Sequence, residues 1–263
     1  MDEPEIKKLK QETANTQVVI LAGGKAKRMG NAEKPKALLE LCGKPLIDYC
    51  IELCKNCGFK DFILLLGYKH EEIERHCGKG SKYGIKIKYS IEPENYSGKG
   101  KALKYALQKN VIDKTKRSFI IFPDDIILDK HLPIKLLLHH LYGVESLKTI
   151  ATNVFASGTE YPFGVGKTDN NGIVLEFVEK PFIPELTNTG ICVIETEVYP
   201  IIEDLIDLNT SESIEFEKII LPKLALLKKL YSMIVPYEIW VSINTQKEYE
   251  NAERVLREKQ NYK

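Results

Sequence analysis

A group of basic residues follows two glycines near the start of the chain, where a short apolar run ends. The run is Val18–Leu21, and the glycines are Gly23 and Gly24; the basic residues are Lys25, Lys27, Arg28, Lys34 and Lys36. Glycines let a loop come close to a ligand, so that backbone N–H groups and fixed positive charge can bind a polyphosphate. A solvated basic turn is the alternative, and this stretch alone leaves the two interpretations evenly balanced.

Two adjacent carboxylates, Asp124 and Asp125, follow a second apolar run, Phe119–Phe122. Mg²⁺ prefers one or two carboxylates together with phosphate oxygens, so the pair is a candidate metal site. Aspartates are also common at turns and helix N-caps, and the pair alone favours that explanation. A third candidate is Glu179 with Lys180, which could bind a sugar hydroxyl and a sugar phosphate; an exposed ion pair of little energetic weight is the alternative.

The elements expected in the first half of the chain would bring the first two motifs to one edge. Short apolar runs alternate with helical patterns, which predicts a mostly parallel, three-layer α/β sheet. Ligands bind at the carboxyl ends of such strands, where both motifs would lie. The expected strands are 18–21, 61–66, 86–90 and 118–122, and the expected helices are 45–57, 71–77 and 101–108.

The second half of the chain is predicted to be richer in strands. Asp169–Gly172 is a strong hairpin signal between two of them. We expect strands at 149–156, 164–168, 173–178 and 190–194, helices at 199–206 and 216–226, a strand pair at 230–235 and 238–243, and a closing helix at 246–259.

One compact domain is expected, because no flexible linker or fixed-period repeat interrupts the chain. Residues 1–16 would be an N-terminal extension, a loose helix or a disordered segment, ahead of a single domain at 17–263. Within that domain, an α/β half at 17–125, expected to bind mainly nucleotide, would share a cleft with a β-rich half at 149–245.

The charge balance and hydropathy of the chain argue against nucleic-acid and membrane partners. The chain has 263 residues with 38 Lys and Arg against 37 Asp and Glu, a net charge of +1, which argues against a nucleic-acid partner. No apolar run is long enough for a bilayer and no secretory signal is present, so we expect no membrane partner, a cytoplasmic location and reduced thiols for the six cysteines. Cys50, Cys54 and Cys57 share one helical face, which favours packing over metal binding.

The order of these motifs resembles the sugar-1-phosphate nucleotidyltransferases, which join an NTP to a hexose 1-phosphate. The resemblance covers about residues 17–255. It rests on Leu21–Gly24 with Arg28 and Lys36, then Asp124–Asp125, then Glu179–Pro181, then Asn188–Gly190, and further on Ser97–Leu103, Phe163–Val165 and Trp240–Thr245.

The resemblance implies a Rossmann-like, mostly parallel mixed sheet flanked by helices, with a β-rich sugar-binding half. It implies Mg²⁺ as the cofactor and an NTP and a sugar 1-phosphate as the substrates. It is compatible with a homo-oligomer. The implied site residues fall into four groups. They are Arg28, Lys36 and Asp124 as catalytic residues; Leu21, Ala22, Gly23, Gly24, Lys25, Glu92, Gly98 and Asp124 at the nucleotide; Gly164, Glu179, Lys180 and Asn188 at the sugar phosphate; and Asp124 and Asp125 at the metal.

The chain departs from the family pattern at several positions. Ala26 and Lys27 replace a glycine and a threonine in the loop, and Ser242 stands where relatives of the mannose-1-phosphate type carry a second metal-binding Asp. Asp125, Glu215 and Glu217 are candidates to complete the metal site. Glu92 is one residue out of register with the usual base-reading residue.

The sequence does not determine which nucleotide is transferred or which phosphate acceptor receives it. The Asp124–Asp125 pair resembles the uridylyl- and thymidylyl-type enzymes, whereas 213–224 and 240–245 resemble the mannose-1-phosphate guanylyl type. We favour UTP or dTTP with glucose 1-phosphate, and the guanylyl type is the alternative. Transfer to a non-sugar acceptor, molybdopterin or cobinamide phosphate, is a further candidate function, and so is an inactive nucleotide-binding paralogue.

Overall fold

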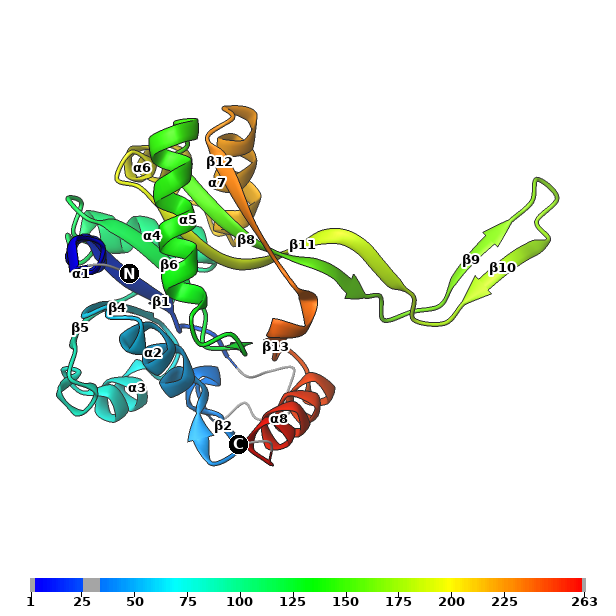
Figure 1. Ribbon diagram of the computed structural model, residues 1–263, viewed down its shortest axis with the longest axis horizontal. Coiled ribbons are helices and arrows are strands. Elements are labelled where there is room, and N and C mark those ends of the chain that lie inside the picture. The colour runs from blue at the N-terminus through cyan, green and yellow to red at the C-terminus, as the bar shows by residue number, and fades with distance from the viewer. Residues whose placement is uncertain (1–2, 26–33, 262–263) are drawn as a thin grey trace.

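The structure is a computed structural model that describes residues 3–25 and 34–261. Its centre is a seven-stranded sheet in the order β12-β8-β11-β6-β1-β4-β5 (Figure 1). β11 runs antiparallel to both of its neighbours, and the other adjacent strands of this sheet are parallel. The strands are β1 (Thr16–Leu21), β4 (Asp61–Leu66), β5 (Lys86–Ile91), β6 (Arg117–Ile121), β8 (Ala151–Glu160), β11 (Phe182–Ile194) and β12 (Leu230–Val235). The predicted α/β class is confirmed.

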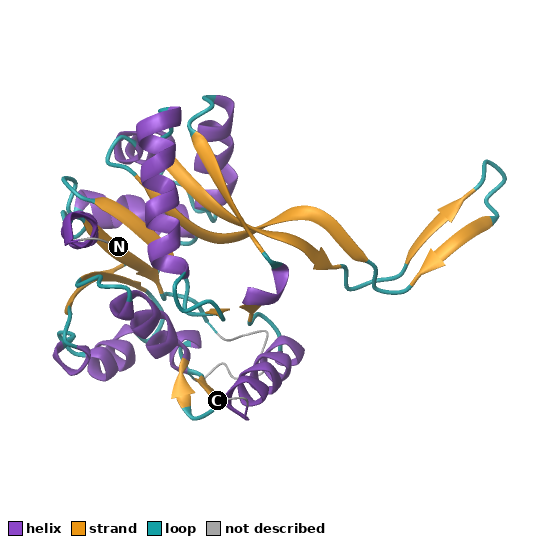
Figure 2. Cartoon of the chain, in the orientation of Figure 1, coloured by secondary structure: helices purple, strands orange, loops and turns teal. Residues whose placement is uncertain are grey.

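Helices cover both faces of this sheet (Figure 2). Successive side chains of a strand point to opposite faces, so Val18 and Ile20 pack with α2, α3 and α5, while Val19 packs with α4, α6 and α7. The helices are α1 (Glu3–Ala14), α2 (Leu46–Asn56), α3 (His70–Cys77), α4 (Lys99–Gln108), α5 (Leu132–Leu147), α6 (Val198–Leu205), α7 (Phe216–Leu226) and α8 (Gln246–Asn261).

Smaller elements complete the described chain. Two short ladders, β2 with β3 and β7 with β13, lie beside α8 in a third apolar cluster. They are β2 (Glu40–Leu41), β3 (Lys44–Pro45), β7 (Asp125–Ile127) and β13 (Trp240–Ser242), and the single turns of 3-10 helix are η2 (Lys36–Leu38), η3 (Ser81–Tyr83) and η4 (Tyr237–Ile239).

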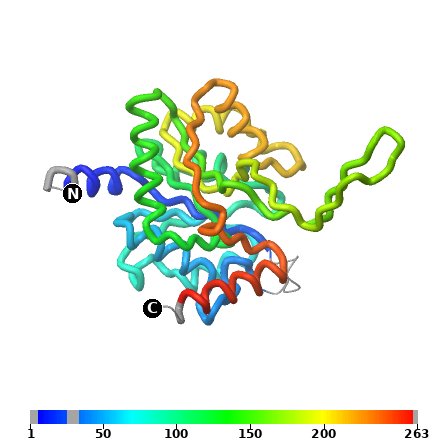
Figure 3. Tube along the Cα trace, turned by 45° about the vertical axis from the view of Figure 1, so that its right-hand side comes forward, coloured from blue at the N-terminus to red at the C-terminus, as the bar shows by residue number. Residues whose placement is uncertain are grey.

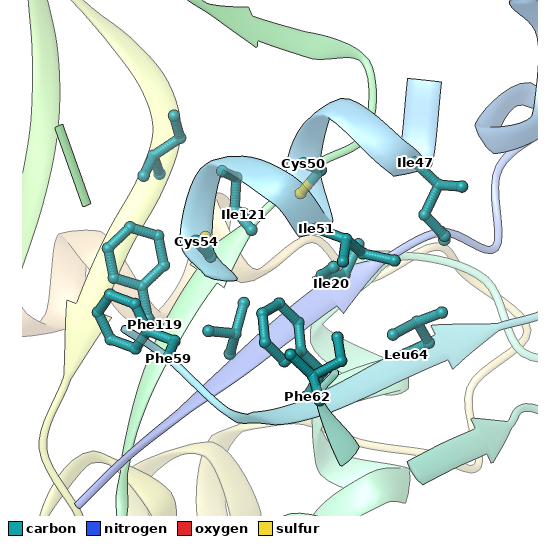
Figure 4. Packing of buried hydrophobic residues seen from close by; sticks show 14 of the residues in the cluster. Ile20, Ile47, Cys50, Ile51, Cys54, Phe59, Phe62, Leu64, Phe119 and Ile121 are labelled. Atoms are coloured by element: carbon teal, nitrogen blue, oxygen red, sulfur yellow. The ribbon is translucent and has the colours of Figure 1, made fainter. Parts of the chain in front are cut away.

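The cysteines of α2 pack against the sheet, as their spacing predicts. Cys50 and Cys54 are buried among Phe59, Phe119 and Ile121 (Figure 4), and Cys57 lies half-buried at the edge of the same cluster. All six cysteines are free, and within residues 3–25 and 34–261 no group of three or more His, Cys, Asp or Glu side chains is arranged to hold a metal ion. Burial raises the pKa of the Cys50 and Cys54 thiols, which keeps both in the neutral form.

An arm, residues 158–186, projects from the sheet in both views (Figures 1 and 3). The outer parts of β8 and β11 form its base, and the hairpin of β9 (Val165–Thr168) and β10 (Val174–Val178) forms its tip. The predicted turn is present, because the Asp169 carboxylate accepts hydrogen bonds from the backbone of Asn171 and Ile173. Every residue of β9 and β10 is exposed.

Two expectations need correction. The stretches 230–235 and 238–243 do not pair with each other: β12 joins β8 and β13 joins β7, because Pro236 and the turn η4 separate them. The fourth β-rich strand is longer than predicted, since β11 begins at Phe182. Of the two alternatives for the N-terminal segment, the structure shows the helix, α1, which Glu12 ties to Arg117 of β6 by an ion pair at 2.5 Å.

Candidate functional site

A cavity of about 1320 Å³ lies at the carboxyl ends of β1, β4, β5 and β6. Ligand sites usually measure about 300–1,000 Å³, so this one has room for two substrates. Most of the residues that the sequence implicates meet here: Leu21, Gly23, Gly24, Lys25, Glu92, Gly98, Asp124, Asp125 and Asn188. The edge rule for parallel strands explains why the two motifs come together although about a hundred residues separate them.

The first part of the glycine loop forms one wall. A Cβ on Gly23 would lie 2.9 Å from Glu92 Oε1 and 3.1 Å from the backbone N of Gly67, so a side chain at this position would force Glu92 to shift and would crowd the Gly67 backbone. Ala22 is buried, donates its N–H to the Leu65 carbonyl at 2.8 Å, and borders a smaller neighbouring cavity. The predicted site residue Arg28 lies outside the described residues.

Lys36 and Asp124 form an ion pair at the mouth of that smaller cavity. The Lys36 ammonium lies 2.5 Å from Asp124 Oδ2 and also donates to Asn244 Oδ1 at 3.1 Å. Both ion-pair side chains are largely covered, at 16% and 28% exposed, so the interaction is stronger than at an open surface. Asn244 is a contact that the sequence did not single out, because its role depends on a lysine more than two hundred residues away.

Asp125 sits beside Asp124 on β7. Trp240 donates its indole N–H to Asp125 Oδ1 at 2.8 Å, and the β7–β13 ladder places Ser242 directly opposite Asp125. Burial and the neighbouring Asp124 charge raise the pKa of Asp125 well above its ordinary value. Two adjacent carboxylates, of which Asp124 is paired with Lys36, could hold a divalent cation, because Mg²⁺ uses one or two carboxylates and leaves room for phosphate oxygens.

Glu92 lies over two glycines at the end of β5. Its Oε2 is buried and has no hydrogen-bond partner in the described chain, while Oε1 rests against Gly23 and Gly67. Burial, and to a lesser extent Glu215, raises the pKa of Glu92 to about 7. A half-protonated carboxyl that faces a cavity is available to a polar ligand.

Gly98 begins the helix α4 in a conformation that needs glycine. Its φ is +96°, and a Cβ there would lie 2.3 Å from the Ile214 carbonyl. The next residue, Lys99, donates its backbone N–H to Glu215 and its ammonium to Glu217. The ammonium also lies 4.4 Å from the centre of the Phe122 ring. Glu215 and Glu217 therefore serve Lys99, and they do not group with Asp124 and Asp125 as metal ligands in the described chain.

The predicted sugar-phosphate residues separate into two places. Asn188 lines the cavity, and its Oδ1 accepts from the Asn153 side chain at 2.9 Å and the Gly190 backbone at 2.8 Å. Gly164, Glu179 and Lys180 lie on the arm, outside the residues that line the cavity. The resemblance does not anticipate this separation, because motif order carries no information about how far a ribbon projects.

The fold and the site together define the class of this protein: it is an α/β protein with a ligand cavity at the carboxyl edge of its sheet. Residues 17–259 match the family model described as nucleotidyl transferase, and the chain belongs to that family.

Named relatives fall into two groups. A UTP–glucose-1-phosphate uridylyltransferase of Synechocystis is 31% identical over 68% of this chain and 49% of that protein. A mannose-1-phosphate guanylyltransferase catalytic subunit beta of Drosophila melanogaster is 28% identical over 89% of this chain and 61% of that protein. The chain thus spans half to three fifths of the length of these relatives.

A solved structure shares the fold. It is a proposed glucose-1-phosphate thymidylyltransferase from Bacillus anthracis in complex with a sucrose, with a TM-score of 0.71, 22% identity, and coverage of 92% of this chain and 95% of that one. None of the described helices is long and apolar enough to cross a membrane.

Proposed function

We propose that this chain joins a nucleoside triphosphate to a hexose 1-phosphate, which yields a nucleotide sugar and pyrophosphate. The observation that carries the proposal is one cavity edge shared by the Gly23–Gly24 loop, the Lys36–Asp124 ion pair and Asp125. Family membership and the named relatives support the same reaction. On this proposal 17–125 binds mainly nucleotide, 149–245 binds mainly sugar phosphate, and the free thiols favour the reducing cytoplasm.

The reaction needs no protein nucleophile. A phosphate oxygen of the sugar attacks the α-phosphorus in line; the new O–P bond forms while the bond to the bridging oxygen breaks, and that oxygen leaves with pyrophosphate. Lys36, which the Asp124 carboxylate and Asn244 hold in position, would stabilise the negative charge that develops on the phosphates. Arg28, whose role rests only on the resemblance to the family, would also stabilise this charge. The glycine loop would position the nucleotide through its backbone.

Mg²⁺ is the proposed cofactor, and Asp124 and Asp125 would hold it. Burial, and then the neighbouring Asp124 charge, raise the pKa of Asp125; a bound divalent cation would offset both effects and would supply charge neutralisation at the phosphate oxygens. Ser242 opposite Asp125 provides no carboxylate, so the remaining coordination positions would fall to water and phosphate.

Glu92 is the proposed contact for the nucleobase. A carboxyl with a pKa of about 7 is partly neutral at physiological pH, and the neutral form offers one donor and one acceptor. Uracil and thymine present the matching N–H and carbonyl, so UTP or dTTP with glucose 1-phosphate is the favoured pair. The ionised form accepts two hydrogen bonds and would instead suit the two adjacent donors of guanine, which keeps GTP with mannose 1-phosphate as the second candidate.

A pyrophosphate-release assay with a matrix of NTPs and hexose 1-phosphates tests the proposal. Release with UTP or dTTP and glucose 1-phosphate is the expected result, and no release with any pair would overturn the enzymatic function. The Glu92→Gln variant then tests the base contact. An amide keeps one donor and one acceptor, so turnover with UTP or dTTP should survive, whereas Glu92→Ala should raise KM about tenfold or more.

A further inference from the structure

The seven-stranded sheet has two edge strands, β5 and β12, and the described chain protects them differently. β5 carries the exposed lysines Lys86 and Lys88. At this edge the Ile87 N–H donates to the Lys79 carbonyl at 3.2 Å, so the loop after α3 covers part of it. Charged residues and covering loops keep an edge from pairing with another chain. β12 carries no charged residue, its ladder to β8 has no bulge, and no described strand pairs with its outer side.

The backbone groups of β12 alternate between β8 and the open side of the strand. Lys229, just before the strand, bonds toward β8, since its carbonyl accepts from the Ala151 N–H at 3.2 Å. The residues one, three and five positions later therefore point to the open side: Leu230, Ser232 and Ile234. The contact of His139 fits this direction, because its Nε2 donates to the Ser232 carbonyl at 2.9 Å. A carbonyl has two lone pairs, so that of Ser232 can still accept from another chain.

Exposed apolar side chains flank this edge on both faces of the sheet. α5 packs on one face of β12 and α7 on the other (Figure 1). Ile234 is 56% exposed, and Tyr142 of α5 is 55% exposed with its ring centre 6.5 Å from that of Tyr231. Exposed apolar surface around an unpaired edge is typical of an interaction site. The other exposed apolar residues nearby are Leu138, one turn before Tyr142, and Leu226 and Leu227 at the end of α7.

The two ends of β12 carry opposite charges. Lys228 precedes the strand and Glu238 follows it; both are exposed, and neither forms an ion pair within the described chain. When two identical strands run antiparallel, the start of each lies beside the end of the other. Centred on Ser232, such a pair brings Lys228 opposite Pro236 of the other copy, two residues from its Glu238. The edge is therefore complementary in charge to a second copy of itself.

We propose that two copies of this chain pair their β12 strands, antiparallel and centred on Ser232, so that two seven-stranded sheets become one sheet across a twofold axis. Leu230 of each copy lies opposite Ile234 of the other, and the outward N–H and C=O groups bond across the axis. The contact is isologous, so it closes at a dimer. A stable interface buries about 800 Å² per partner, more than one strand provides, and the flanking apolar residues of α5 and α7 supply further area.

The solution mass of the full chain, from sedimentation or light scattering, measures this dimer without any need for activity. None of the six residues of β12, all of them described, lines the cavity, so the dimer goes beyond the proposed function. Wild type should be a dimer at micromolar concentration. Ile234→Lys gives β12 the kind of charge that β5 carries and should yield a folded monomer, with circular dichroism as the check on folding.

The matched control is Leu175→Lys on β10, where a 69% exposed apolar strand residue of the arm receives the same charge. It should leave the dimer intact. A monomeric wild type, or a dimer that persists in Ile234→Lys, would overturn the proposal. Loss of the dimer in Leu175→Lys would also overturn it, because the contact would then belong to the arm.

Charge reversal tests the direction of the two strands. Lys228→Glu and Glu238→Lys should each raise the Kd of the dimer about tenfold, because two attractive contacts become repulsive. The double reversal should restore the Kd to within about threefold of wild type, since opposite charges face each other again. A double variant that dissociates more than either single variant would contradict the antiparallel pairing.

Cysteine substitution tests the register. Residues directly opposite in a hydrogen-bonded antiparallel pair have Cα atoms about 5.5 Å apart, within reach of a disulfide. Ser232→Cys should therefore form a covalent dimer under a mild oxidant. Ile234→Cys is the control, because its counterpart would lie four residues further along the strand, about 13 Å away, which is too far. Equal cross-linking of the two variants would overturn the pairing about Ser232.

Discussion

At the scale of single residues, Asp124 has the most demanding position in the site. It pairs with Lys36, neighbours Asp125, and accepts through its backbone carbonyl a hydrogen bond from Ile243 at 2.8 Å. The backbone contact thus holds the loop in place independently of the side chain, whose carboxylate binds Lys36.

Replacement of this carboxylate should remove catalysis and keep the fold. We expect Asp124→Ala to lower Mg²⁺-dependent turnover by at least about 100-fold, because it removes a proposed metal ligand and the partner of Lys36. Pyrophosphate release and circular dichroism check the two halves of this expectation. The control is Asp129→Ala, which breaks an ion pair with Lys135 away from the cavity. Retained activity in Asp124→Ala would exclude the metal role.

The raised pKa of Glu92 predicts that the effect of its replacement on stability depends on pH. Because folding raises its pKa from 4.5 to about 7, the carboxyl favours the folded state fully below about pH 4.5, and this contribution is lost as the pH rises through about 7. Glu92→Gln, which cannot ionise, should therefore raise the free energy of unfolding by roughly 1–3 kcal/mol at pH 8 and have little effect at pH 4.

Urea denaturation at the two pH values measures this difference. Glu94→Gln, at an exposed position two residues further on, is the matched control and should show no such gain. If Glu92→Gln changed the free energy of unfolding equally at both pH values, burial would not be disfavouring the ionised form of Glu92, and the prediction would be contradicted.

At the scale of elements, the start of α4 depends on one glycine. Gly98→Ala would place a methyl group against the Ile214 carbonyl in a backbone conformation that only glycine adopts easily. We expect a loss of about 2 kcal/mol or more in unfolding free energy, together with weaker nucleotide binding. Gly78→Ala isolates the backbone part, since Gly78 also has a positive φ but no atom within 4 Å of its Cβ position; it should cost only about 1 kcal/mol. Equal losses would contradict the steric explanation.

At the scale of the whole molecule, one largely buried network joins elements that are far apart in the chain. Arg117 of β6 contacts Glu12 of α1 and Glu195 after β11, and Glu195 accepts from the buried His140 of α5 at 3.1 Å. Burial alone raises the pKa of Glu195, but the hydrogen bond from His140 and the charge of Arg117 outweigh it and lower the pKa below its ordinary value.

This network should make stability sensitive to acid. A carboxylate whose pKa is lowered on folding stabilises the protein above about pH 4.5, and that contribution is lost as the pH falls through its folded value. Glu195→Gln should cost about 1–3 kcal/mol at pH 7 and much less at pH 3, as thermal or urea unfolding would measure. The exposed Glu185→Gln is the control, and a pH-independent loss would show that the charge of Glu195 is not what matters.

Local chemistry was enough to predict much of the frame. The runs Val18–Leu21 and Phe119–Phe122 are apolar on both faces, which is typical of buried parallel strands, and the edge rule then places Gly23 and Asp124 at one cavity. The spacing of Cys50 and Cys54 likewise indicates a face packed on the sheet. These features depend only on the periodicity of apolar residues and on neighbours close in sequence, and both can be read directly from the amino-acid sequence.

Only the tertiary structure decided the contacts between distant segments. These contacts join residues more than a hundred positions apart, and no local pattern encodes which partner a side chain meets: Lys36 with Asn244, Asp125 with Trp240, and Lys99 with Glu217. The same holds for the arm. The sequence alone indicates that Glu179 and Lys180 follow a hairpin strand. The pairing of β8 with β11, which joins segments distant in the chain and carries register shifts at 183/186 and 188/192, places them on the arm, outside the cavity beside Asn188.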